Sequence, residues 1–115
     1  MSDLKLRTKR YALEVIRMYS AMPKNSVSQV LGRQVLRSGT SVGANYREAT
    51  RARSDAEFSA KVGDCLKELE ETVYWLELLA EAEILPLVKL SALLKEADEL
   101  TAILVTSVKT AKTRR

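Results

Sequence analysis

Three polar residues within positions 37–49 are the best candidates for chemistry in this chain. Ser41, Asn45 and Glu48 follow one another at intervals of four and three residues, so a helix would place all three on one face. A hydroxyl, an amide and a carboxylate on one face can bond to a neighbouring helix, hold a ligand or assist a nucleophile. We call these three residues the polar stripe.

Catalysis is the least favoured use of the polar stripe. The chain contains no His, and the turn that holds the serine has neither His nor Lys to activate its hydroxyl. Ligand binding stays open. We expect a structural role against a helix over residues 55–83, with Arg47, Arg51 or Lys61 as the ion-pair partner of Glu48. The sequence therefore predicts no catalytic residue and no enzyme.

No metal or cofactor is expected either. Cys65 is the only cysteine, which excludes an internal disulfide, a Cys/His zinc site and a Cys–His nucleophile. Glu68 and Glu71 stand three residues apart and could hold a metal in principle. On a helix this rich in Glu, they are expected to be solvated or to be partners of the polar stripe.

The sequence also indicates the cellular compartment of the protein. A lone cysteine is typical of a reducing environment. Residues 1–20 carry charges throughout and lack the apolar core of a signal peptide. The longest uncharged run, 100–108, is too short to span a bilayer. We expect a cytoplasmic protein with no membrane partner.

Hydrophobic periodicity predicts four helices, over about residues 4–22, 26–50, 55–83 and 87–110. Proline stops the first helix and precedes the fourth, and the pattern Ser-Asp-Ala-Glu is a capping box for the third. Short connections favour antiparallel neighbours. The expected fold is all-α: one domain, 1–115, forming an antiparallel up-down-up-down four-helix bundle.

Two glycines stand inside the second predicted helix. Gly39 and Gly43 each cost about 1 kcal/mol relative to Ala in a helix interior. They predict a bend or, more readily in a chain of long helices, a close approach of another backbone.

In this topology the basic residues are expected to gather at one end of the bundle. The net charge is +4, and the N-terminus, the second loop and the C-terminus would share one end of the bundle. Such an end attracts a polyanion such as RNA or DNA, or simply complements helix dipoles. The candidate nucleic-acid-binding residues there are Lys5, Arg7, Lys9, Arg10, Arg47, Arg51, Arg53, Lys109, Lys112, Arg114 and Arg115.

The third predicted helix has an unusually wide apolar face. Beside its main seam runs a second apolar edge that includes Trp75 and Leu79. Such width often means contact with more than one neighbour. We expect one of these two residues at a subunit interface or directly beneath it, and hence a homo-oligomer.

The chain resembles the four-helix-bundle family of 23S rRNA intervening-sequence proteins. The resemblance is carried by residues 38–49, 54–58, 66–69 and 74–79, and most specifically by the Ser-x-x-x-Asn-x-x-Glu pattern of the polar stripe. After the Asn, many members have Ala-Glu-Gly where this chain has Tyr-Arg-Glu-Ala. The resemblance implies a left-handed bundle, homopentamers around a central opening, and no known enzymatic activity.

Two functions remain open at this point. The first is a non-catalytic oligomer whose basic ends gather into one surface for RNA or DNA, where several weak patches gain avidity. The second is a protein–protein scaffold or accessory subunit without a nucleic-acid partner.

Overall fold

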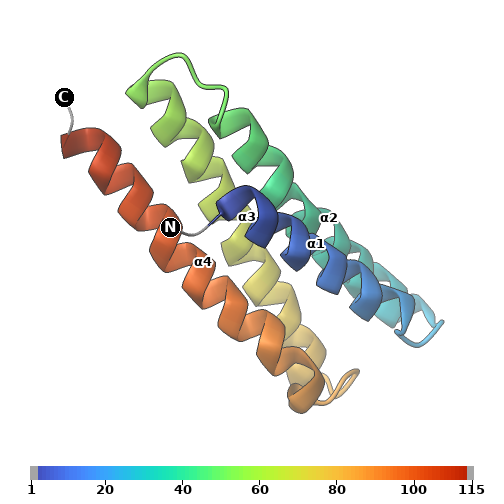
Figure 1. Ribbon diagram of the computed structural model, residues 1–115. Helices are drawn as coiled ribbons and strands as arrows, with labels where there is room; N and C mark the ends of the chain where they lie inside the picture. Colours follow the sequence, from blue (N-terminus) through green and yellow to red (C-terminus); the bar gives the residue numbers. More distant parts are fainter. Residues whose placement is uncertain (1–2, 114–115) are drawn as a thin grey trace.

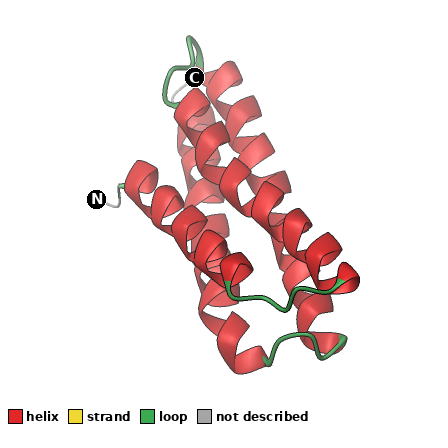
Figure 2. Cartoon of the chain, turned by 90° about the vertical axis from the view of Figure 1, so that its right-hand side faces the viewer, coloured by secondary structure: helices red, strands yellow, loops and turns green. Residues whose placement is uncertain are grey.

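The computed structural model describes residues 3–113, and these form four α-helices (Figure 1). They are α1 (Leu4–Ser20), α2 (Ser26–Ala49), α3 (Asp55–Glu81) and α4 (Leu87–Thr113). All predicted helices are confirmed, and their bounds differ from the predicted ones by three residues at most. The described residues contain no strand (Figure 2).

Local side chains set where three of the helices begin. The carboxylate of Asp3 accepts a hydrogen bond from the backbone N–H of Leu6, 3.2 Å away. Ser54 caps α3 in the same way through the N–H of Glu57, at 3.0 Å. Asn25 caps α2, although the sequence analysis had not singled it out. Each such cap is worth about 1 kcal/mol, because it satisfies an N–H that the helix leaves unpaired.

Contacts between helices show the antiparallel order. Lys61 of α3 reaches Glu48 of α2, and Thr72 further along α3 reaches Ser38 further back on α2. Consecutive helices pack along their length, whereas α1 approaches α4 at few positions and has no Cα atom within 8 Å of a Cα atom of α3. The result is an up-down-up-down four-helix bundle of 50 × 20 × 20 Å.

The two ends of the bundle differ. The α1–α2 loop (21–25) and the α3–α4 loop (82–86) lie at one end, which we call the two-loop end (Figure 2). The α2–α3 loop (50–54) lies at the other end, near the C-terminus of α4.

One apolar core fills the space between the helices. Its fully buried members come from all four helices, and burying each side chain contributes about 1.5–3 kcal/mol. Within the described residues, no helix combines the length and the apolar content that crossing a bilayer requires. Representative core side chains are Val15, Val35, Val42, Val62, Leu69, Leu76, Leu79, Leu90, Leu100 and Leu104.

Glycines allow α1 to lie very close to α2, which confirms the close approach predicted for Gly39 and Gly43. A Cβ added at Gly39 would lie 2.8 Å from Cγ2 of Val15. One added at Gly43 would lie 3.2 Å from Oγ1 of Thr8 and 3.4 Å from its carbonyl carbon. Both are closer than ordinary van der Waals contact, and α2 continues through both positions without a break.

Candidate nucleic-acid interface

The polar stripe makes one contact with a neighbouring helix. Glu48 accepts a hydrogen bond of 2.7 Å from Nζ of Lys61, one of its three predicted partners. Ser41 instead donates to the carbonyl of Arg37 in its own helix, at 2.6 Å. Asn45 is half-buried, and its side chain has no hydrogen bond to any described residue. The expected register-setting network therefore does not run through Ser41 or Asn45.

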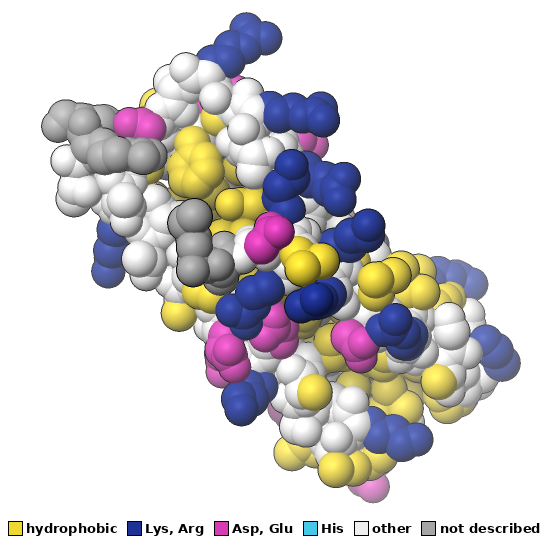
Figure 3. All heavy atoms as spheres, in the orientation of Figure 1, with side chains coloured by type: hydrophobic (Ala, Val, Ile, Leu, Met, Phe, Trp, Pro, Cys, Tyr) yellow, Lys and Arg dark blue, Asp and Glu magenta, His cyan; other side chains and the backbone are white. Residues whose placement is uncertain are grey.

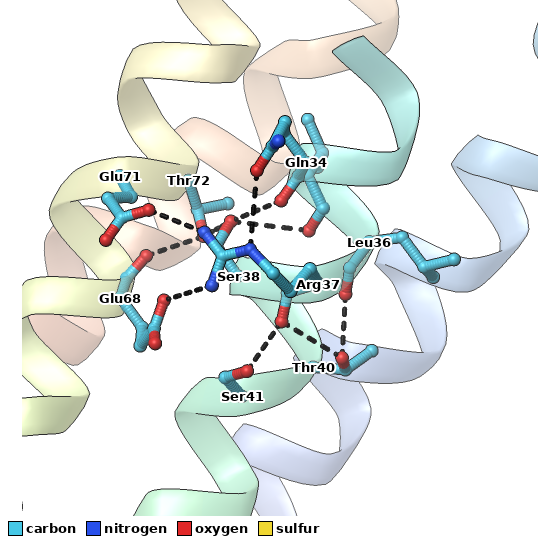
Figure 4. Close-up of polar contacts among 10 residues, drawn as sticks. Gln34, Leu36, Arg37, Ser38, Thr40, Ser41, Glu68, Glu71 and Thr72 are labelled. Atoms are coloured by element: carbon cyan, nitrogen blue, oxygen red, sulfur yellow. Dashed lines mark hydrogen bonds and ion pairs between the residues drawn. The ribbon is translucent and has the colours of Figure 1, made fainter. Parts of the chain in front are cut away.

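Other polar contacts join α2 to α3 one turn before Ser41 (Figure 4). The guanidinium of Arg37 donates to Glu68 at 3.2 Å and to Glu71 at 2.5 Å. Partial burial lowers the pKa of Arg37, the hydrogen bonds to Glu71 and Glu68 raise it, and the net shift is upward. The two carboxylates thus serve an inter-helix ion pair, and residues 3–113 hold no cluster of three or more metal-ligating side chains.

A buried hydroxyl pair stands behind this ion pair. Oγ1 of Thr72 lies 2.7 Å from Oγ of Ser38, and both side chains are fully buried. Ser38 in turn donates to the carbonyl of Gln34, 2.9 Å away (Figure 4). Sequence reasoning did not single out either residue of this pair.

The variant Thr72→Val will lower the free energy of unfolding by about 1 kcal/mol, since it removes a buried hydrogen bond while keeping the side-chain shape. Ser41→Ala is the matched control: it removes a hydroxyl whose partner lies within its own helix, so its effect will stay within about 0.5 kcal/mol. Urea unfolding of both variants checks this. Equal midpoints for the two would contradict it.

Three basic residues surround a depression over the seam between α1 and α2. Lys5 and Lys9 come from α1 and Arg47 comes from the last turn of α2. The depression has a volume of about 280 Å³, and none of its lining residues is acidic. All three cations are exposed, so their charges are free to meet an anion from solvent.

The close approach of α1 and α2 builds this depression. Gly43 forms part of its floor and leaves no side chain between Thr8 and the α2 backbone. The hydroxyls of Thr8 and Thr40 each donate to a carbonyl of their own helix at 2.7 Å. The exposed cations are therefore the chemically available groups, and the site suits a phosphate rather than a group that needs hydroxyl donors.

The predicted single basic end is wrong for all four of the candidate residues on α1 (Figure 1), since Lys5 and Lys9 line the α1–α2 depression instead. Arg7 binds Glu96 at 2.7 and 3.1 Å and Glu99 at 3.3 Å, beside the middle of α4, and these hydrogen bonds raise its pKa. Arg10 faces the space between α1 and α4. The reason is length: α1 has 17 residues and α4 has 27, so α1 does not reach the far end. Figure 3 shows basic side chains along this face rather than at one end.

Four other predicted residues do lie at the end away from the two-loop end. Arg51 and Arg53 are exposed on the α2–α3 loop, and Lys109 and Lys112 are exposed near the C-terminus of α4. Arg114 and Arg115 lie outside the described residues. The available basic surface thus runs from this end along the α1–α2 seam.

The two predicted interface residues differ in exposure. Leu79 is fully buried in the core, so it cannot itself touch a second chain. Trp75 is half-buried, with its ring centroid 5.1 Å from that of the exposed Tyr74. Its indole N–H is buried and has no hydrogen-bond acceptor among residues 3–113.

Comparison with known proteins places this fold in a family. The sequence model of the family described as 23S rRNA-intervening sequence protein matches residues 3–106. The chain belongs to this family. A solved structure of similar fold is a protein with unknown function from the S23 ribosomal protein family of Bacteroides thetaiotaomicron. It is 34% identical, with a TM-score of 0.86, over 93% of this chain and 99% of that one. No curated protein matches the chain.

Family membership confirms the resemblance that the sequence analysis drew from residues 38–49 and 74–79. Those residues fall in α2 and α3, the two helices with the most extensive mutual contact. Within the polar stripe, Glu48 is the residue that meets α3, through Lys61.

Proposed function

We propose that this intervening-sequence family member is a non-catalytic, cytoplasmic homo-oligomer that binds RNA or DNA through backbone phosphates. The observation that carries the proposal is the acid-free depression between Lys5, Lys9 and Arg47. The α2–α3 loop adds the exposed cations Arg51 and Arg53 beyond the end of α2, and the end of α4 adds the exposed Lys109 and Lys112. The free, buried thiol of Cys65 fits a reducing compartment.

Electrostatics explains why such a surface would bind nucleic acid. Each phosphate that a Lys or Arg neutralises releases condensed counterions, so affinity falls steeply as salt rises. A single patch of three cations binds weakly. Several copies in one assembly, five by the family resemblance, would bind one polyanion with much higher avidity. The name of the family makes RNA the first nucleic acid to test.

Charge reversal on the seam tests this function. We expect Lys9→Glu/Arg47→Glu to weaken binding of a labelled RNA at low salt by at least about tenfold. The number of counterions released on binding should fall by about two per copy, so the affinity should depend less steeply on salt. Fluorescence anisotropy across a salt series measures both quantities. Circular dichroism checks that the helices remain.

The matched control changes the net charge equally at a distance from the seam depression. Lys24→Glu/Arg33→Glu reverses two exposed cations in the α1–α2 loop and the first half of α2. It should keep most of the affinity. If both double variants weaken binding equally, the site is not the seam. If the unmodified protein binds neither RNA nor DNA at low salt, the scaffold function replaces this one.

A further inference from the structure

A groove separates α1 from α4 in the half of the bundle nearest the two-loop end. It has a volume of about 820 Å³, and its lining includes Leu13, Met18 and Leu93. Leu13 is 41% exposed, a large fraction for a leucine in a helical bundle. Apolar side chains are visible at the surface in the lower part of the view in Figure 3.

The groove exists because α1 and α4 are joined at one level only. The ion pairs of Arg7 with Glu96 and Glu99 hold the two helices together near the middle of α4. Below this level, toward the two-loop end, no described side chain fills the space between Tyr11 or Met18 on one side and Leu93 on the other. Exposed apolar surface of this kind costs about 25 cal/mol for each Å², which a second apolar surface would recover.

The rim of the groove is positive. Of its acidic residues, Glu14 pairs with Arg17 and Glu96 pairs with Arg7. Arg10 and Lys89 also line the groove, and neither forms an ion pair with a described residue. An occupant should therefore carry an apolar centre flanked by carboxylates.

The outer face of α3 has this chemistry. Glu70, Tyr74, Glu77 and Glu81 follow at intervals of four and three residues, so they share one helix face. Tyr74 is 54% exposed, and the three carboxylates are exposed without an ion pair to any described residue. We call these four residues the acidic face.

The acidic face and the groove lie at the same height along the bundle. With a rise of 1.5 Å per residue, Arg10 and Glu70 both lie about 15 Å from the two-loop end along the bundle axis, and Leu13 and Tyr74 both lie about 10 Å from it. Lys89 and Glu81 both lie within about 3 Å of that end. A rotation axis parallel to the helices preserves height, so it can bring the groove of one copy against the acidic face of the next.

Two buried polar atoms without partners flank the proposed contact. The hydroxyl of Tyr11 is buried beside the groove, and the indole N–H of Trp75 is buried beside Tyr74. Neither has a hydrogen-bond partner among the described residues. Buried polar groups are normally paired, so each of these two atoms calls for an explanation, and burial against a second chain is the one that fits their position beside the two surfaces.

We propose that the groove between α1 and α4 receives the acidic face of a second copy of this chain. Tyr74 lies on Leu13 and Leu93, while Glu70 meets Arg10 and Glu81 meets Lys89. The inference rests on the proposed self-assembly and names the surfaces that form it. The contact joins two different surfaces, so repeating it gives a head-to-tail assembly, which closes into a ring where the rotation between neighbouring copies allows it.

Reciprocal charge reversal tests the contact, with light scattering after size exclusion as the measurement. The groove variant Arg10→Glu/Lys89→Glu and the face variant Glu70→Arg/Glu81→Arg should each be monomeric, at least about 100-fold weaker in association. An equimolar mixture of the two should reassemble, because each contact then joins opposite charges. The chain carrying all four changes should also reassemble alone. The Lys24→Glu/Arg33→Glu variant should keep the unmodified mass.

The outcomes separate this inference from the proposed function. If the unmodified protein is oligomeric and both reversed variants keep its mass, the interface lies elsewhere and self-assembly stands. If the unmodified protein is monomeric at every concentration, both this contact and the proposed self-assembly are wrong, and the groove is open to another partner. RNA binding by the monomeric variants then reports on the basic seam by itself.

Discussion

Gly39→Leu will lower the free energy of unfolding by about 3 kcal/mol, the largest loss that we expect from a single side chain added to this bundle. The first atom of the new side chain would lie 2.8 Å from Cγ2 of Val15, which is itself fully buried. A β-branched side chain on a helix has essentially one rotamer, so Val15 cannot turn away. The new residue must therefore push α1 from α2 and open the core. Thermal unfolding should show a midpoint about 10 °C lower.

Gly63→Leu is the matched control for this variant. Gly63 also lies inside a helix, but no heavy atom outside its own helix lies within 4 Å of an added Cβ. There the substitution should stabilise the protein by up to about 1 kcal/mol, because leucine favours the helix and glycine does not. Val15→Ala should restore part of the stability when combined with Gly39→Leu. If the two leucine variants shift the midpoint alike, α1 and α2 are not in close contact.

The sequence was sufficient for the architecture because each element carried its own local signal. The apolar period defined the helices, and Ser54 and Pro86 marked starts that the structure confirms to within a residue. The close contact at Gly39 was also predictable, since a buried glycine in a long helix has few other uses. Such signals depend on the neighbouring residues in the chain and not on tertiary contacts.

The partners of the polar residues were harder to predict. Ser41, Asn45 and Glu48 do share a helix face. The position of a residue on that face, however, does not determine which residue of α3 lies opposite it, or at what distance. Extending the same row back one turn would have included Arg37, four residues before Ser41. Arg37 has a side chain long enough to reach Glu68 and Glu71, whereas Ser41 is too short and turns to its own backbone.

The position of the N-terminal cations in the bundle also could not be predicted from the sequence. The up-down order of the helices predicts the direction of α1, but not its height along the bundle axis relative to α4. That height follows from the contacts of Thr8 with Gly43 and of Arg7 with Glu96, which are tertiary. A helix ten residues shorter than its neighbour leaves its first turn beside the middle of the bundle. The basic seam therefore lies along the bundle and not at its end.

The core contains an acid whose titration should weaken the fold at high pH. Cys65 is fully buried, and its Sγ lies 3.5 Å from the carbonyl of Val42. Burial, with a smaller contribution from the charge of Asp64, raises the pKa of its thiol from an ordinary 9.0 to about 12. Burial also raises the pKa values of Tyr11 and Tyr46. All these groups stay protonated in the folded chain at pH values where the unfolded chain has released the proton.

The direction of the pH effect on stability follows from the number of protons that the folded and unfolded states bind. Between about pH 9 and pH 12 the folded state holds one more proton at Cys65 than the unfolded state, so stability is present below this range and falls as pH rises through it. The slope from this thiol is about 1.4 kcal/mol per pH unit. Cys65→Ala removes that slope and leaves the tyrosines, so urea unfolding of both chains from pH 8 upward isolates it. Below about pH 8.5 the variant should differ only by a constant packing loss.

Thiol chemistry gives an independent measurement of the same burial. Because the thiolate is the reactive form, native Cys65 should react with a disulfide reagent at pH 8 at least about 100-fold more slowly than the urea-unfolded chain does. Parallel stability curves for the protein and Cys65→Ala above pH 9, or rapid labelling of the native thiol, would show that water reaches Cys65. A solvated Cys65 would in turn mean that α2 and α3 separate near Val42, and the ion pair between Glu48 and Lys61 one turn away would then be too exposed to hold their register.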